Sequence, residues 1–184
     1  MKYISILRGI NVSGQKKIKM LDLKSLYESL GFHNVETYIQ SGNVIFDDNE
    51  KDKIDLKTTI EATINKKYKF QVPVEIRTKH EFKNIIHNNP FASIDVEENA
   101  TKLLITFLSS KPSKINISNI LKQVTPPEAL VVNGQEVYLY CPNGYGKSKL
   151  SNTFLEKKLD VTATTRNWKS VHKIYELSAQ SKVK

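Results

Sequence analysis

LVVNGQEVYLY, the stretch at residues 130–140, carries the strongest local structural signal in the chain and decides what kind of sheet it forms. Strand-like runs at 130–132 and 136–140, apolar apart from Glu136 and rich in Val, Leu and Tyr, flank the pair Asn133-Gly134. An Asn-Gly pair between two such runs is typical of a tight turn that joins antiparallel strands. The stretch therefore predicts a β-hairpin, which favours an antiparallel or mixed sheet over a single doubly wound parallel sheet.

The elements around this hairpin have an order that the first half of the chain repeats. In the second half, hydrophobic periodicity and turn residues indicate strand 103–108, helix 117–124, the hairpin, helix 148–159, a short strand 161–163 and helix 165–178. In the first half they indicate strand 3–7, helix 20–30, a hairpin of strands 35–39 and 44–46, helix 53–68, strand 72–77 and a helix ending near Asn89.

This repeated order predicts the fold class and the domain organisation. We expect an α+β protein made of two ferredoxin-like split β-α-β units (βαββαβ type), each with an appended helix. The first unit spans 1–90, a connector spans 91–101, and the second unit spans 102–184 with a basic C-terminal part. Within the first unit, Thr78 and Glu81 have the spacing of a capping box and predict a helix start.

The whole chain has the composition of an ordinary globular protein, with 184 residues and a net charge of +9. The apolar strand at 3–7 is too short for a signal peptide, and Arg8 follows it at once. No apolar run approaches the roughly 20 residues that span a bilayer. The single cysteine, Cys141, excludes an internal disulfide. These features predict a cytoplasmic protein without a membrane partner and leave its oligomeric state open.

The positive charge is concentrated in two segments. Residues 8–24 hold five Lys or Arg and one Asp, and residues 141–184 hold nine Lys or Arg and three acids. Basic segments rich in Gly and Asn suit anionic ligands, because exposed backbone N–H groups and cations act together. The distribution favours an anionic small molecule or a nucleic acid as partner, although a merely solvated basic face has the same composition.

Three short motifs in these segments supply the candidate ligand-binding residues. They are Arg8-Gly9-Ile10-Asn11, the loop 143–148 (NGYGKS) and Thr165-Arg166-Asn167-Trp168. Charge would come from Arg8, Lys147 and Arg166, hydrogen bonds from Asn11, Asn143 and Ser148, and a stacking surface from Tyr145 or Trp168. Asn167 completes the set of candidates.

The second and third motifs are expected to form the principal anion site together. The loop 143–148 leads from a strand into a helix that Ser148 would cap, and Arg166 lies at the start of another helix. A cation at a helix N-terminus is unfavourable unless an anion offsets it, so Arg166 beside Lys147 indicates a bound anion. The alternative is a structural salt bridge from Arg166 to a nearby acid, Asp160 or Glu156.

The hairpin turn Ser41-Gly42-Asn43 is expected to lie away from Arg8. In a split β-α-β unit we place this turn at the opposite sheet end from the end of the first strand, where Arg8 lies. The two would share one site only if their loops wrap around the sheet.

The sequence shows no catalytic constellation. The four histidines lack ligand spacing, and no nucleophile-elbow pattern occurs. Cys141 stands where a nucleotide phosphate loop requires glycine. No metal is expected, no cofactor is indicated, and whether the protein is an enzyme is left open.

Five motifs together resemble a known family. They are Leu7-Arg8-Gly9-Ile10-Asn11, Tyr38-Ile39-Gln40-Ser41-Gly42-Asn43-Val44, Asn89-Pro90-Phe91, Tyr145-Gly146-Lys147-Ser148-Lys149-Leu150 and Thr165-Arg166-Asn167-Trp168. In this order they closely resemble the bacterial family catalogued as domain of unknown function 1697, over nearly the whole chain. The resemblance implies a soluble α+β protein and brings no established activity. A binding protein for an anionic ligand is the first hypothesis; an enzyme for a phosphorylated or nucleotide substrate and a structural protein are the alternatives.

Overall fold

The computed structural model describes residues 1–180 and has a mixed α+β fold with two four-stranded antiparallel sheets and seven α-helices. The first half contains β1 (Lys2–Leu7), α1 (Met20–Ser29), β2 (His33–Tyr38), β3 (Asn43–Asp47), α2 (Lys53–Tyr68), β4 (Val74–Thr78) and α3 (Lys79–His87). The second contains α4 (Val96–Asn99), β5 (Leu103–Leu108), α5 (Lys114–Leu121), β6 (Ala129–Asn133), β7 (Glu136–Tyr140), the 3-10 helix η1 (Tyr145–Lys147), α6 (Asn152–Leu159), β8 (Ala163–Asn167) and α7 (Trp168–Ala179). Two lysines of the basic C-terminal part, Lys182 and Lys184, lie outside the described residues.

The chain divides into two compact units. The first consists of Met1–Asn84 together with residues 174–180, and the second is Ile85–Lys173. The predicted connector at 91–101 contains the short helix α4.

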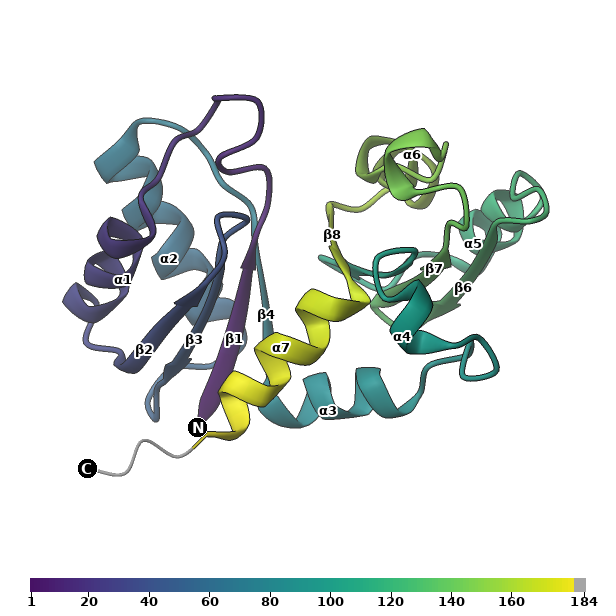
Figure 1. Ribbon diagram of the computed structural model, residues 1–184. Coiled ribbons are helices and arrows are strands. Elements are labelled where there is room, and N and C mark those ends of the chain that lie inside the picture. The colour runs from purple at the N-terminus through teal and green to yellow at the C-terminus, as the bar shows by residue number, and fades with distance from the viewer. Residues whose placement is uncertain (181–184) are drawn as a thin grey trace. The chain divides into compact units, whose positions relative to one another are not determined.

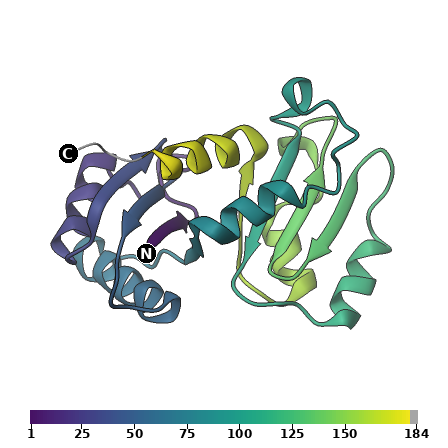
Figure 2. The ribbon, with the colours of Figure 1, turned by 90° about the horizontal axis from the view of Figure 1, so that it is seen from below.

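The first sheet has the strand order β2-β3-β1-β4, with every neighbouring pair antiparallel. Helices α1 and α2 cover one of its faces (Figure 1, Figure 2). Alternate residues of β1, Tyr3 and Leu7 among them, join the core beneath these helices because side chains on a strand alternate between faces. The predicted hairpins are confirmed, and helix 53–68 forms with the bounds expected from the spacing of its apolar residues.

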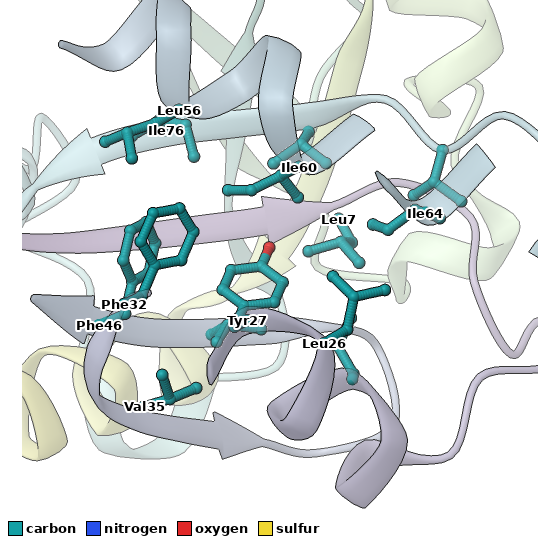
Figure 3. Close-up of a cluster of buried hydrophobic side chains, with 14 of the residues drawn as sticks. Leu7, Leu26, Tyr27, Phe32, Val35, Phe46, Leu56, Ile60, Ile64 and Ile76 are labelled. Atoms are coloured by element: carbon teal, nitrogen blue, oxygen red, sulfur yellow. The ribbon is translucent and has the colours of Figure 1, made fainter. Parts of the chain in front are cut away.

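Aromatic side chains fill the core of the first unit. The rings of Phe32 and Phe46 stack with their centroids 4.6 Å apart, and Tyr27 meets Phe46 edge-on at 5.4 Å. Figure 3 shows these three rings grouped beside aliphatic side chains of both helices. The Tyr27 hydroxyl lies 2.7 Å from the hydroxyl of Ser5, so the buried polar groups satisfy each other. Burial raises the pKa of Tyr27, which keeps the ring neutral.

The second sheet repeats this arrangement down to single hydrogen bonds. Its order is β6-β7-β5-β8, and α5 and α6 supply helical residues to its core. In the first unit, the N–H of Leu7 donates to the Gly42 carbonyl at 2.8 Å. In the second, the N–H of Leu108 donates to the Gln135 carbonyl at the same distance. The predicted repetition is thereby confirmed, while the narrower ferredoxin-like assignment stays a prediction.

The predicted start of the last helix is wrong. Residues 165–167 belong to strand β8, and helix α7 begins only at Trp168. Strand β8 pairs with β5 over five residues, from Leu104 opposite Asn167 to Leu108 opposite Ala163. This pairing depends on residues some 60 positions away in the chain, which local periodicity does not reveal.

The predicted capping box at the start of α3 is confirmed. Glu81 accepts the N–H of Thr78 at 2.8 Å, and the N–H of Glu81 donates to the Thr78 hydroxyl at 3.1 Å. Lys53 also donates to the Glu81 carboxylate. Although burial raises the pKa of Glu81, the bonds from Lys53 and Thr78 outweigh it and hold that pKa below its ordinary 4.5.

We therefore expect Glu81→Gln to remove an acid-sensitive part of the stability. A carboxyl group whose pKa is lowered by folding stabilises the fold above its unfolded pKa and loses that contribution as pH falls through the folded value. The difference in unfolding free energy between wild type and variant should be largest near pH 7 and shrink below pH 4.5. Urea titrations at several pH values measure it. A difference that is constant with pH would contradict the assignment, because glutamine keeps the capping bond and cannot titrate.

Candidate functional site

The loop between β1 and α1, residues 8–19, is held in shape by Asn11. The side-chain amide of Asn11 donates to the Ile18 carbonyl, and its oxygen accepts the Ile18 N–H, both at 2.9 Å. The backbone of Asn11 has a φ of +57°, a conformation that asparagine tolerates better than most residues. Lys16 also has a positive φ, +44°. Asn11, predicted as a ligand hydrogen-bonding residue, therefore organises the loop that carries Arg8.

The hairpin turn at residues 39–42 joins this loop, contrary to our expectation. The Asn11 amide donates to the Gln40 carbonyl at 2.9 Å, and Leu7 donates to Gly42. The expectation was wrong because β1 and β3 are antiparallel neighbours, so the end of β1 meets the start of β3 and the turn before it. A Cβ on Gly42 would lie 2.6 Å from Cδ1 of Ile10, so only glycine fits this approach.

A third segment, residues 64–73, comes to the same end of the sheet. It contains the last turn of α2 and the chain leading into β4, which runs antiparallel to β1. Lys16 donates to the Gln71 carbonyl at 2.7 Å, and the N–H of Arg8 donates to the Pro73 carbonyl at 2.9 Å. Figure 1 shows all three segments at the end of the first sheet where β1 finishes.

We call the segments 8–19, 39–42 and 64–73 the basic end. They contain no acid and seven cations, namely Arg8, Lys16, Lys17, Lys19, Lys66, Lys67 and Lys69. All but Arg8 and Lys16, which are half-buried, have exposed side chains. The basic end is therefore a concentrated positive surface whose cations come from two distant parts of the sequence, 8–19 and 64–73, with the uncharged turn 39–42 joined to the first of them.

The start of helix α1 adds to this positive potential. Lys19 is the N-cap residue of α1, and its side chain makes no capping hydrogen bond. The partial positive charge of the helix N-terminus is therefore not offset by a capping side chain. Asp22 in the first turn offsets part of this potential. The net field at the basic end favours an anion.

Sequence analysis missed the contribution of α2 to this surface. Lys66 and Lys67 occupy the last turn of a helix, where cations complement the helix dipole and require no ligand. The antiparallel strand order predicted from the hairpins already implied that the end of α2 meets the end of β1. Combining that topology with the positions of the lysines would have placed Lys66 and Lys67 beside the loop after β1.

The predicted loop 143–148 in the second unit has a different structure from the one expected. It forms the 3-10 turn η1, and helix α6 begins later, at Asn152. Ser151, not Ser148, caps that helix by accepting the Phe154 N–H at 3.3 Å. Ser148 instead accepts the Leu150 N–H at 2.9 Å. The intervening turn separates the loop from the helix dipole, so the predicted strand-to-helix anion geometry does not form.

The other polar residues of this loop have mixed surroundings. Asn143 and Lys147 are exposed. Tyr145 is half-buried, and its hydroxyl lies 3.3 Å from the hydroxyl of Thr165 on β8. Tyr145 thus ties the loop to the sheet.

Arg166 lies on β8, only 8% exposed, and not at a helix N-terminus. It donates to the Thr164 hydroxyl at 3.2 Å and to the Thr165 carbonyl at 2.9 Å. Neighbouring strand residues point to opposite faces, so Arg166 points away from the face where Thr165 meets Tyr145. Burial lowers the pKa of Arg166 to about 10. The dipole argument for an anion beside Arg166 therefore no longer applies.

The residues that follow Arg166 have structural contacts. Asn167 accepts the N–H of Ser170 at 2.8 Å and so caps α7. Trp168 is 3% exposed, and its ring lies 5.2 Å from that of His172.

Within residues 1–180, no three His, Cys, Asp or Glu side chains are grouped so that they could hold a metal ion. Cys141 is buried, which raises the pKa of its thiol. No helix in this part of the chain combines the length and apolar character required to cross a membrane.

Comparisons with known proteins agree with the fold and add no activity. The model of a family described as "Protein of unknown function (DUF1697)" matches residues 1–138. A solved structure, that of a conserved bacterial protein from Streptococcus pneumoniae, superposes with a TM-score of 0.72 at 22% sequence identity. The match covers 96% of this chain and 98% of that chain. No curated protein matches the sequence.

Proposed function

Since the chain belongs to DUF1697, a family of proteins of unknown function, we propose a function from its own residues: the basic end binds the phosphate groups of a nucleic acid. The observation that carries the proposal is the meeting of three sequence segments with seven cations and no acid. Each phosphate that such a surface neutralises releases counterions, which drives binding.

The exposure of the cations favours a nucleic acid over a small enclosed phosphate. Five of the seven side chains are exposed and spread over two of the segments. Mobile, solvated lysines suit a row of phosphates, whereas a single phosphate is better held by converging buried donors. Arg8 and Asn11 keep a part in this proposal. They belong to the loop 8–19, whose shape Asn11 fixes and which carries Lys16, Lys17 and Lys19.

The loop with Asn143 and Lys147 was predicted as part of the principal anion site, and in this proposal it is a second, weaker contact. Both side chains are exposed on a basic stretch of the second unit. Arg166, Asn167 and Trp168 suit binding less well. Arg166 and Trp168 are buried, and the side chains of Arg166 and Asn167 form hydrogen bonds within the fold.

Salt titration of oligonucleotide binding tests the proposal. Wild type should bind both single- and double-stranded DNA at low salt, and the logarithm of the affinity should fall linearly with the logarithm of the salt concentration. Replacing Lys17, Lys66 and Lys67 with Gln should weaken binding. The slope should fall by about 0.9 for each duplex phosphate that the variant no longer neutralises.

A matched variant shows whether binding depends on the basic end or only on the net charge of the chain. Lys111, Lys114 and Lys122 are exposed lysines of the second unit, and their replacement with Gln removes the same charge. We expect that variant to bind nearly as well as wild type. Equal losses of affinity in both variants would contradict a role for the basic end. If inorganic phosphate raises the melting temperature and oligonucleotides do not bind, the nucleic-acid proposal is wrong and the ligand is a small phosphorylated molecule.

A further inference from the structure

Each sheet has two edge strands, and three of the four edges are protected. The edges are β2 and β4 in the first sheet and β6 and β8 in the second. An edge strand has backbone N–H and C=O groups that pair readily with another strand, and natural proteins block them with charges, bulges or proline. Among these four edge strands in the described part of the chain, β6 is the one whose backbone groups are open to a partner strand.

The edges β4 and β8 are blocked in the same way. The Glu61 carboxylate of α2 accepts the N–H of Val74 at 2.8 Å, at the start of β4. In the second unit, the Glu156 carboxylate of α6 accepts the N–H of Ala163 at 2.9 Å, at the start of β8. On β4 the buried Glu75 also pairs with Lys57 of α2 at 3.1 Å. A carboxylate from the preceding helix therefore occupies the start of each edge.

The edge β2 is blocked by its own irregularity. Its pairing with β3 shifts register between His33 and Glu36, and Asn34 within the shift has a φ of +51°. Such a bulge twists the strand away from a flat partner, and Glu36 adds a charge.

The edge β6 has none of these devices. It pairs with β7 in unbroken register from Ala129 to Asn133 and contains neither a charge nor a proline. Within residues 1–180, no hydrogen bond reaches β6 from outside this hairpin. Val131, at the middle of the strand, is 37% exposed. Glu128 is the single charged residue between 123 and 135, and Glu136 lies on β7 opposite Asn133 at the turn end of the strand.

We propose that β6 pairs antiparallel with β6 of a second copy of the chain, joining two second-unit sheets edge to edge. The inference is independent of the proposed nucleic-acid binding. We take a second copy as the occupant because β6 is self-complementary. The strand is uncharged, so two copies meet there without like charges facing each other, and its outward backbone groups match those of an identical antiparallel strand. The net charge of +9 opposes contact between copies elsewhere, which confines the pairing to this strand.

The register of the hairpin supports a two-fold arrangement about Val131. The turn has two residues, with a positive φ at Gly134, and closes on the pair Asn133 and Glu136. Because such a turn closes on a hydrogen-bonded pair and pairs then alternate, Leu130 and Val132 direct their backbone groups to the open edge. A two-fold axis at Val131 therefore lets Leu130 of one copy bond with the residue at position 132 of the other, as in an isologous dimer.

The test measures the mass of the full chain in solution by sedimentation over roughly a hundred-fold range of concentration. Wild type should move from one chain to two as concentration rises. Val131→Lys places two cations together at the axis and should remain a single chain. The matched control Ile115→Lys changes a residue that is 72% exposed on α5 and should dimerise like wild type. A wild type that stays monomeric, or a dimer that Val131→Lys leaves intact, would overturn the proposal.

A cysteine variant keeps the test decisive should Val131→Lys fold poorly. At a two-fold axis, the two residues at position 131 form a non-hydrogen-bonded pair with Cα atoms about 4.5 Å apart, within the range of a disulfide. The one native cysteine, Cys141, is buried, so a Val131→Cys thiol is the reactive one. Mild oxidation should give a covalent dimer, which Ile115→Cys should not form. An absence of cross-linking, or equal cross-linking in both variants, would count against the β6 interface.

Discussion

Gly42→Val is expected to destabilise the first unit by about 3 kcal/mol, as the sum of overpacking and a left-handed backbone that valine resists. Gly42 has a φ of +79°, and an added Cβ would lie 2.6 Å from Ile10 and 2.9 Å from Leu7. Because the same turn is bonded to Asn11 through Gln40, we also expect weaker oligonucleotide binding where the variant is still folded. Urea unfolding and salt titration measure the two effects.

Gly31→Ala is the matched control for the backbone effect. Gly31 has a φ of +85°, but an added Cβ would meet no atom within 4 Å. We expect a loss of about 1 kcal/mol, from the backbone alone. If the two variants lose equal stability, the close packing of the turn against the loop contributes nothing.

Arg166→Ala is expected to lower the stability of the second unit by about 2–3 kcal/mol. The side chain is buried on β8, and its removal leaves the Thr164 hydroxyl and the Thr165 carbonyl without this charged donor. Ligand binding should change little in the folded fraction, because Arg166 is not part of the basic end. Thermal and urea unfolding, followed by oligonucleotide titration, give both quantities.

Lys147→Ala is the comparison for this variant. Lys147 is exposed, and its replacement should change the unfolding free energy by no more than about 0.5 kcal/mol. Unchanged stability of Arg166→Ala together with an abolished ligand response would restore Arg166 as a binding residue and contradict its structural role.

Much of the fold follows from local sequence signals. The two hairpin turns, the apolar spacing in helix 53–68 and the Thr78–Glu81 pair each depend on residues close together in the chain, and each is confirmed. The start of α7 was misplaced because residues 163–167 become a strand only through their pairing with β5. Local propensity does not determine such non-local pairing.

The candidate site was predicted in part. Arg8 and Asn11 were identified from their motif, and the structure places them in the loop at the centre of the basic end. Lys66, Lys67 and Lys69 were missed because their part in the surface arises from the direction of β4 relative to β1, not from a motif. The turn at 39–42 was placed at the wrong sheet end for the same reason: strand direction, rather than residue type, brings it to Asn11.

The two copies of the internal repeat differ in the loop that follows their first strand. The two sheets share strand order and matching hydrogen bonds, but the connections after their equivalent strands differ. Between β1 and α1 the connection takes residues 8–19, whereas the counterpart between β5 and α5 is only 109–113. One scaffold, used twice, thus carries a long connecting loop in the first copy and a short connection in the second. Changes to residues 8–19 can accordingly alter the surface of the first unit while the repeated sheets stay the same.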